Sequence, residues 1–345
     1  MKIIGCDFHP SYQQIAMLDL ESGEETILTL EHEDGQARGF YEELRGQPVL
    51  IGMEASGNSL WFERLMAELG HELWLGDAAK IRSRETRRQK TDRRDAALIL
   101  KLLVKGDFPK LWLPTLAMRD TRQLLLHRHK LVQMRTRVKN ELQHLALNQG
   151  VRLKSKLWSE AGRQVLEALP LAGWTKQRRT DLLELLAELN RKIAELNQAA
   201  EREAAKHVDV ALLRTHPGVG PITALAFMVT IGEVERFPGS RQLASYLGLI
   251  PSEESSGRRR RLGAITKQGS PFLRMLLVEA GQSAAKYDPE LKRAYQRLKH
   301  KKCSAIAKVM VARKLAVRQY WMLRTQQPYR PTRMQGGPSH PVVAG

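Results

Sequence analysis

The sequence is poor in cysteine and contains no long apolar run. Only Cys6 and Cys303 are present, and they lie in different parts of the 345-residue chain. Two distant cysteines argue against a disulfide framework or a zinc cluster and favour a reducing compartment. No stretch approaches the roughly 18 apolar residues of a membrane-spanning helix, and residues 1–5 have the pattern of a strand and not of a signal peptide. We therefore expect a cytoplasmic protein without membrane contact.

Acidic residues become scarce relative to basic ones after residue 75. The formal net charge of the whole chain is +19. Residues 1–75 contain fourteen Asp and Glu against four Lys and Arg, a net charge of −10, so residues 76–345 carry +29. An acidic first module joined to a strongly basic remainder indicates a polyanionic partner, and both DNA and RNA fit this charge.

The first hundred residues alternate short apolar runs with helical patterns. Five strands and two helices are predicted, the strands at 2–7, 14–20, 25–31, 48–53 and 71–75 and the helices at 36–44 and 59–69. The order of three strands, helix, strand, helix, strand predicts an α/β layer in which an antiparallel meander leads into parallel strands.

Four acidic side chains are placed to meet at one edge of this sheet. Asp7 and Glu54 each follow an apolar strand directly, at the end where ligands of such sheets bind. Asp92 and Asp95 lie three residues apart at the start of a predicted helix, so both carboxylates project from one face. Close carboxylates are unfavourable unless a cation lies between them. We predict a two-metal site here, which can activate a nucleophile at a phosphodiester; the alternatives are ordinary strand-end, loop and first-turn acids.

Basic side chains crowd the loop before that helix and its first turn. They are Arg87, Arg88, Lys90, Arg93 and Arg94. Basic groups beside a cluster of acids are expected where a phosphate backbone lies against a metal site. The alternative is a solvated charged surface.

Beyond residue 108 the sheet pattern ends and two long helices are predicted, at 119–147 and 176–206. Arg128 and Arg135 interrupt the apolar stripe of the first helix, where a coiled-coil seam needs apolar groups. We interpret this face as lying along a nucleic-acid backbone, with a solvated surface face as the alternative. The second helix keeps a strict four-three alternation of apolar residues. This seam either packs onto the first helix or joins protomers in a homodimer or tetramer.

Two glycine-containing segments follow in the last third of the chain. Gly218 and Gly220 lie in a tight turn between two predicted helices, which resembles the helix-hairpin-helix motif and suits a phosphate; an ordinary corner between helices is the alternative. Further on, Ser256 is followed by glycine and a run of cations: Arg258, Arg259, Arg260 and Arg261, with Lys267 beyond. A small hydroxyl beside glycine can approach a phosphate closely, but these residues alone favour a flexible, solvated basic loop.

The first module resembles the ribonuclease H-like fold of RuvC-type Holliday-junction resolvases. The segments 6–7, 52–57 and 90–96 are more specifically similar to the bridge-RNA-guided DEDD transposases of the insertion-sequence one-ten family. This resemblance implies that Asp7, Glu54, Asp92 and Asp95 bind Mg²⁺, or Mn²⁺ in its place. It also implies a structured guide RNA that pairs with target and donor DNA.

A second set of motifs is similar to the C-terminal transposase domain of the same family. These are Gly248-Leu249-x-Pro251, Ser256-Gly257 and Lys267-x-Gly269. The resemblance implies that Ser256 attacks DNA and forms a covalent phosphoserine link. The preceding residue, Ser255, stands where an acid is common in the family.

Together these features predict a DNA recombinase that is cytoplasmic and nucleoid-associated when bound to DNA. We expect a RuvC-like metal-binding domain at 1–108, a helical coiled-coil spacer at 109–206 and a mostly α-helical transposase domain carrying Ser256 at 207–325. Residues 326–345 are rich in Pro, Gly and Arg and are expected to be disordered. Two alternatives remain: a metal-dependent junction resolvase or nuclease without a covalent intermediate, and a non-catalytic nucleic-acid-binding scaffold.

The charge distribution generates the first testable prediction. Binding to duplex DNA should weaken steeply with salt, because each phosphate contact releases counterions and contributes a log–log slope of about −0.9. The measurement is the dissociation constant of the full chain across a salt series. A flat dependence between low and physiological ionic strength would contradict a polyanionic partner.

Overall fold

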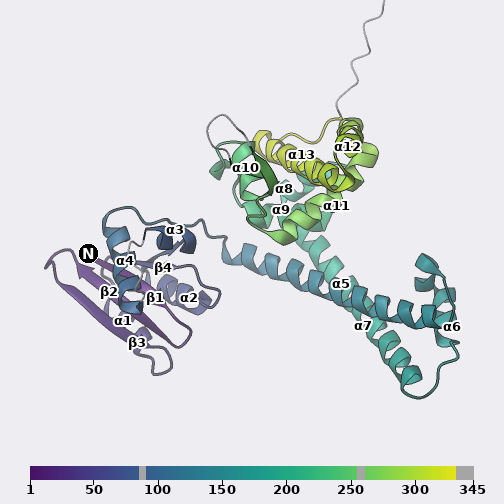
Figure 1. The fold of residues 1–345 in the computed structure, drawn as a ribbon. Coiled ribbons are helices and arrows are strands. Elements are labelled where there is room, and N and C mark those ends of the chain that lie inside the picture. Colours follow the sequence, from purple (N-terminus) through teal and green to yellow (C-terminus); the bar gives the residue numbers. More distant parts are fainter. Residues whose placement is uncertain (85–90, 255–260, 332–345) are drawn as a thin grey trace, which may run out of the picture. The chain divides into compact units, whose positions relative to one another are not determined.

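The computed structural model describes residues 1–84, 91–254 and 261–331 (Figure 1). Contacts between residues divide the chain into two units, residues 1–113 and 114–345. The predicted α/β layer lies in the first unit, and both long helices lie in the second.

A five-stranded sheet forms the centre of the first unit. Its strands are β1 (Lys2–Phe8), β2 (Tyr12–Asp19), β3 (Glu25–Glu31), β4 (Val49–Glu54) and β5 (Glu72–Gly76). The strand order is β3-β2-β1-β4-β5, antiparallel between β1, β2 and β3 and parallel between β1, β4 and β5. This confirms the predicted meander that leads into parallel strands. The apolar run of β4 is continuous because helices cover both faces of the sheet.

The side chains of β1 alternate between these two covered faces. Ile4 and Cys6 pack under α1 (Gln36–Glu43) and α2 (Leu60–Leu69). Ile3 packs on the other face, with α3 (Ala78–Ser83) and α4 (Asp92–Val104). Because the side-chain period of a strand is two, Asp7 belongs to the same face as Ile3 and Gly5. The alternation thus directs Asp7 to the side of the sheet that α4 covers.

Helix α4 packs against β1 at Gly5 with no room for a side chain. A Cβ at Gly5 would lie 2.3 Å from the carbonyl oxygen of Ala96 and 2.3 Å from the amide nitrogen of Leu100. Glycine therefore lets the helix backbone contact the strand backbone. This close approach brings the first turn of α4 beside the end of β1.

The second unit is almost entirely helical. Its long helices are α5 (Leu116–Asn148) and α7 (Gly173–Ala205), with a 3₁₀ turn η1 (Lys154–Trp158) and α6 (Glu160–Glu167) between them. The other helices are α8 (Val208–Arg214), α9 (Pro221–Ile231), α10 (Ser240–Tyr246), α11 (Pro271–Tyr287), α12 (Pro289–Lys301) and α13 (Ser304–Thr325), with a 3₁₀ turn η2 (Val234–Arg236). Within the described residues, no helix is both long and apolar enough to cross a membrane.

The apolar stripe of α7 packs against α5 of the same chain. Leu189 and Ile193 of α7 are buried in one cluster with Val138 and Leu142 of α5. Of the two roles predicted for the seam, the structure shows the contact between the two long helices of one chain. The segment 150–173 contains η1 and α6, which lie at the end of this helix pair away from α9–α13 (Figure 1).

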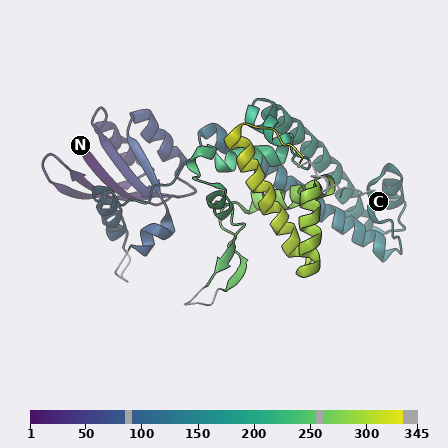
Figure 2. The ribbon, with the colours of Figure 1, turned by 90° about the horizontal axis from the view of Figure 1, so that it is seen from above.

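Two short strands flank the basic segment around Ser256, of which residues 255–260 lie outside the described part of the chain. Strands β6 (Pro251–Glu253) and β7 (Leu262–Ile265) pair antiparallel and extend away from the helices of this unit (Figure 2). Two glycines with positive φ allow close backbone crossings at the base of this hairpin. A Cβ at Gly248 would lie 2.4 Å from the Gln268 backbone, and one at Gly269 would lie 2.3 Å from the Tyr246 carbonyl oxygen. Strands this short carry too little apolar alternation to be predicted from sequence.

The segment after α13 has no regular structure, but it makes specific contacts where it is described. The hydroxyl of Tyr329 donates to Asp288, whose side chain also accepts from Arg318 at 2.5 Å. The ring of Tyr329 packs on His216, 4.3 Å between centroids. Residues 326–331 are therefore held against the turn before α9, and residues 332–345 lie outside the description.

The contact at Gly5 generates the second prediction. Gly5→Ala should destabilise the first unit by about 1–3 kcal/mol, because backbone atoms on α4 cannot yield to a methyl group as a flexible side chain would. Hydrogen exchange of the full chain should show faster exchange of amides in β1 and α4.

Gly39→Ala in α1 is the matched control. An added Cβ at Gly39 would meet nothing within 4 Å, so this variant should be neutral or up to about 1 kcal/mol more stable. Equal exchange rates in the Gly5→Ala and Gly39→Ala variants would show that α4 does not depend on this approach.

Candidate active site

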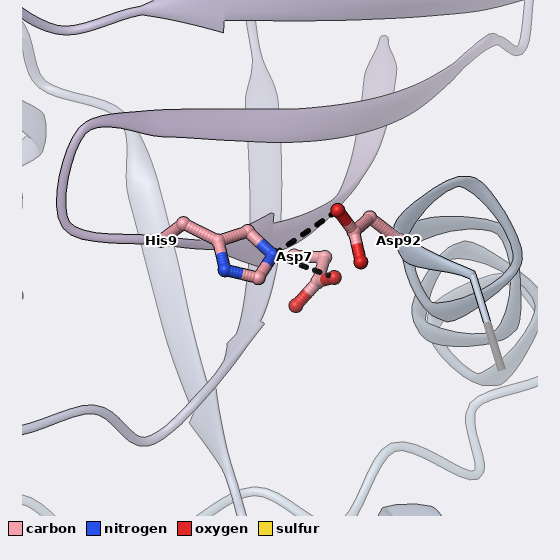
Figure 3. Close-up of side chains that lie close together, drawn as sticks. All are labelled: Asp7, His9 and Asp92. Atoms are coloured by element: carbon pink, nitrogen blue, oxygen red, sulfur yellow. Dashed lines mark hydrogen bonds and ion pairs between the residues drawn. The ribbon is translucent and has the colours of Figure 1, made fainter.

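Asp7, His9 and Asp92 converge at the end of β1 (Figure 3). The Nε2 atom of His9 lies 3.2 Å from Oδ2 of Asp7 and 3.6 Å from Oδ2 of Asp92. One possible ligand atom from each of the three residues lies within 4.8 Å of the others. Residues that are 85 positions apart in the sequence are joined here because β1 and α4 meet at Gly5.

Tyr12 completes this group from the start of β2. Its hydroxyl donates to Oδ2 of Asp92 at 2.7 Å, and its ring stacks on His9 with 4.6 Å between centroids. The turn between β1 and β2 is closed by the amide of His9, which donates to the Tyr12 carbonyl at 2.9 Å. Sequence reasoning missed both residues. The available signal was the position of His9, two residues after Asp7 and just beyond a strand that ends in an acid.

The third acid near this group is Asp95, one turn further along α4. Burial raises the pKa of the Asp7 carboxyl, and the negative charges of Asp95 and Asp92 raise that pKa further. His9 acts in the opposite direction, through its charge and its hydrogen bond. The negative charges of both α4 acids thus act on Asp7, and a cation near these carboxylates would be favourable.

Glu54 ends β4, the parallel neighbour of β1. Met53 is paired with Cys6 in the register, so Glu54 and Asp7 follow at the same edge of the sheet. In this structure Oε1 of Glu54 accepts from Arg82 of α3 at 3.0 Å. The structure thus brings Asp7 and Asp92 together, with Asp95 on the same first turn of α4. It pairs Glu54 with Arg82, which the sequence did not predict because α3 itself was not predicted.

The donor set fits a divalent metal ion. Carboxylate oxygens suit Mg²⁺ and Mn²⁺, and an imidazole nitrogen suits the first-row transition metals. The three groups are partly accessible, with 19%, 34% and 43% of the side-chain surface exposed for Asp7, His9 and Asp92. An ion can therefore reach these side chains from solvent.

The long helix α5 carries cations without an acidic partner in the described part of the chain. Arg128 donates to Oδ1 of Asn197 at 2.6 Å, and Lys139 lies 4.7 Å from the centre of the Trp158 ring. Burial, followed by the charge of Arg135, lowers the pKa of both Arg128 and Lys139. Within the described residues, Arg128, Arg135 and Lys139 have no carboxylate partner. The cations of α7 differ, since Arg191 pairs with Glu188 and Glu195.

The remaining predicted contacts are distributed over both units. Arg93 and Arg94 are exposed on the first turn of α4, and Arg261 and Lys267 are exposed at the β6–β7 hairpin. Gly218 has φ +85°, and a Cβ there would lie 2.5 Å from the Ala284 amide nitrogen, so this turn packs on α11. Gly220 precedes α9 and has open space around it. The other predicted residues lie outside the described part: Arg87, Arg88, Lys90, Ser256, Arg258, Arg259 and Arg260.

Comparison with known proteins assigns both units to one kind of protein. Residues 4–149 match a family described as Transposase (DEDD_Tnp_IS110), and residues 210–296 match the Transposase IS116/IS110/IS902 family. A Pseudomonas aeruginosa protein named as a family 20 transposase is 26% identical over 289 residues, which cover 82% of this chain and 84% of that protein.

Two further relatives carry transposase names. The transposase for insertion sequence element IS1111A of Coxiella burnetii is 27% identical over 246 residues, 69% of this chain and 66% of its own length. The Sinorhizobium fredii protein y4rJ, also named as a transposase, is 30% identical over 269 residues, 70% of this chain and 67% of that protein.

An α/β unit with acids at its strand ends, followed by a helical unit, is thus the organisation of a transposase. This chain belongs to the IS110 family of insertion-sequence transposases.

Proposed function

We propose that this protein is an insertion-sequence recombinase that cuts and rejoins DNA, with a metal centre on Asp7, Glu54, Asp92 and Asp95. The observation that carries the proposal is the convergence of Asp7 with the first turn of α4, in a chain whose first unit matches a DEDD transposase family. The mixed strand order of the first unit also agrees with the RuvC-like fold that the sequence resembles.

The residues of the site have separable tasks in this proposal. Asp7 and Asp92 hold the metal from β1 and α4, and the Tyr12 hydroxyl fixes the rotamer of Asp92. Metal ions bound there would supply Lewis-acid stabilisation of charge on phosphate oxygens and activation of a hydroxyl. Glu54 would become the fourth acidic ligand by breaking its ion pair with Arg82 and binding the metal. The Arg82 side chain is 68% exposed, so it can move into solvent. Burial of Asp7 makes its bare charge unfavourable, which strengthens its preference for a cation.

We propose Ser256 as the nucleophile of the recombination. Support comes from the family resemblance of the flanking motifs and from the β6–β7 hairpin, whose described residues lie on either side of Ser256 in the sequence. The amide of Glu254 donates to the Arg261 carbonyl at 3.0 Å, so the β6–β7 pairing extends to the residues that bracket the segment 255–260. In the proposed step, the serine oxygen forms a bond to phosphorus as the bond from phosphorus to the leaving strand oxygen breaks. The serine hydroxyl gives up its proton, the leaving oxygen takes up a proton and departs as a hydroxyl, and the new phosphoester retains the energy needed for rejoining.

The partners proposed for this reaction are donor and target DNA and a structured guide RNA. Arg128, Arg135 and Lys139 on α5, which have no carboxylate partner among the described residues, support a polyanion along this helix. Arg261 and Lys267 support phosphate contacts at the hairpin. A homodimer or tetramer is proposed because recombination joins two DNA sites, although the α7 seam itself packs within the chain.

Substitution of the acids tests the metal centre. Asp92→Asn should reduce DNA strand cleavage by on the order of a hundredfold or more, because it removes a charged ligand while keeping the volume. Asp107→Asn is the control, since the Asp107 side chain is exposed and forms an ion pair with Arg84 at 3.2 Å on the surface. Cleavage by Asp92→Asn at the rate of Asp107→Asn would refute the assignment.

The nucleophile is tested by trapping the protein on cleaved DNA and mapping the linked residue. Ser256→Ala should bind DNA with unchanged affinity and give no covalent adduct and no recombinant product, because no other group takes over the attack. Ser255→Ala should keep substantial activity. Metal-dependent cleavage by Ser256→Ala without an adduct would instead identify a nuclease, the alternative that needs no covalent intermediate.

A further inference from the structure

We propose that His9 is a ligand of the metal centre and supplies a nitrogen donor beside the carboxylates of Asp7 and Asp92. This inference rests on the proposed function, because it assumes that the acids hold a divalent ion. It adds to the four acids a residue that the sequence motifs do not contain.

The spacing of the three donor atoms carries the inference. Mn²⁺ and Mg²⁺ prefer octahedral coordination, and bonds of about 2.1 Å place adjacent ligand atoms about 3 Å apart. His9 Nε2 lies 3.2 Å from Asp7 Oδ2 and 3.6 Å from Asp92 Oδ2. Both separations are close to an edge of such an octahedron, and one ligand atom from each of the three residues lies within 4.8 Å of the others. The imidazole nitrogen is therefore placed to share one ion with the two carboxylates.

The orientation of the His9 imidazole supports its role as a metal ligand. The ring stacks on Tyr12 with an interplanar angle of 19°, and the β1–β2 turn fixes the backbone of His9. Nε2 is the nitrogen that faces both carboxylates (Figure 3). A ring held by stacking loses less side-chain entropy on binding a metal than a free one.

Tyr12 leaves the carboxylate of Asp92 able to bind an ion. An ionised carboxylate offers about four lone-pair sites, and the Tyr12 hydroxyl occupies one of them on Oδ2. Hydrogen bonds of this kind hold metal ligands in place in many proteins. Tyr12 is therefore a positioning residue, one that aligns Asp92 with His9.

A nitrogen donor has a consequence for metal choice. Imidazole suits transition metals, whereas Mg²⁺ is bound by oxygen ligands and retains water. The site should therefore prefer Mn²⁺ over Mg²⁺ more strongly than a centre of carboxylates alone. Removal of the imidazole should reduce this preference.

The experiment is pulsed electron paramagnetic resonance of Mn²⁺ bound to the full-length chain. We expect a ¹⁴N coupling typical of a directly bound imidazole, which ¹⁵N-histidine labelling of the unaltered protein should change to a ¹⁵N coupling. His9→Gln should abolish the coupling and weaken Mn²⁺ binding by roughly 10–100-fold, with a smaller effect on Mg²⁺ measured by competition. Hydrogen exchange of β1 should confirm that the variant is folded.

His32→Gln is the matched control, because His32 contacts the same turn through the Pro10 carbonyl, 3.1 Å from its Nδ1. This variant should retain the coupling. Tight Mn²⁺ binding that requires Asp7 and Asp92 but shows no imidazole coupling would overturn the role of His9 and leave the metal centre intact. Absence of Mn²⁺ binding, or binding unaffected by Asp7→Asn and Asp92→Asn, would overturn the metal centre itself.

Discussion

The backbone contact between β1 and α4 at Gly5 is the constraint on which the candidate site depends. Asp7 lies at the end of β1, and Asp92 and Asp95 lie on the first turn of α4. Burial raises the pKa of Asp7, and the like charges of Asp95 and Asp92 raise that pKa further. Burial of apolar side chains such as Ile99 and Leu103 beneath the helix must outweigh this repulsion. The fold therefore holds like charges together and leaves a cation as the most favourable addition.

The elements that carry the acids could be predicted because their signals are local. Side chains alternate between the two faces of a sheet, so the position of Asp7 in β1 fixes the face to which it belongs. A three-residue spacing puts Asp92 and Asp95 on one face of a helix. His9 had a local signal, its position two residues after Asp7. Tyr12 and Arg82 had none, because the β1–β2 turn and the short helix α3 that bring them to the acids are set by tertiary packing. The same holds for the β6–β7 hairpin, whose short strands are fixed by the backbone crossings at Gly248 and Gly269.

Net charge was a sound guide to the class of partner but not to its position. The second unit contains both neutralised and unneutralised cations, and the structure separates them. Arg191 forms ion pairs with two glutamates on α7. Arg135 and Lys139 on α5 form no ion pair with an acidic side chain among the described residues. Bringing such cations together raises their mutual repulsion, and a bound phosphate backbone relieves it. A count of Lys and Arg alone cannot make this distinction.

The division of the chain into two units bears on the proposed chemistry. The acids and His9 lie in the first unit, and the motifs around Ser256 lie in the second. A serine hydroxyl is a weak nucleophile without a base or a metal, and the nearest histidines in the sequence, His216 and His300, are at least 40 positions away. On the proposed mechanism, neither unit can break a phosphodiester through the serine by itself. Cleavage then requires an assembly that brings the two units to the same phosphate, within one chain or between protomers, and free protein would be inactive until its nucleic acids are bound.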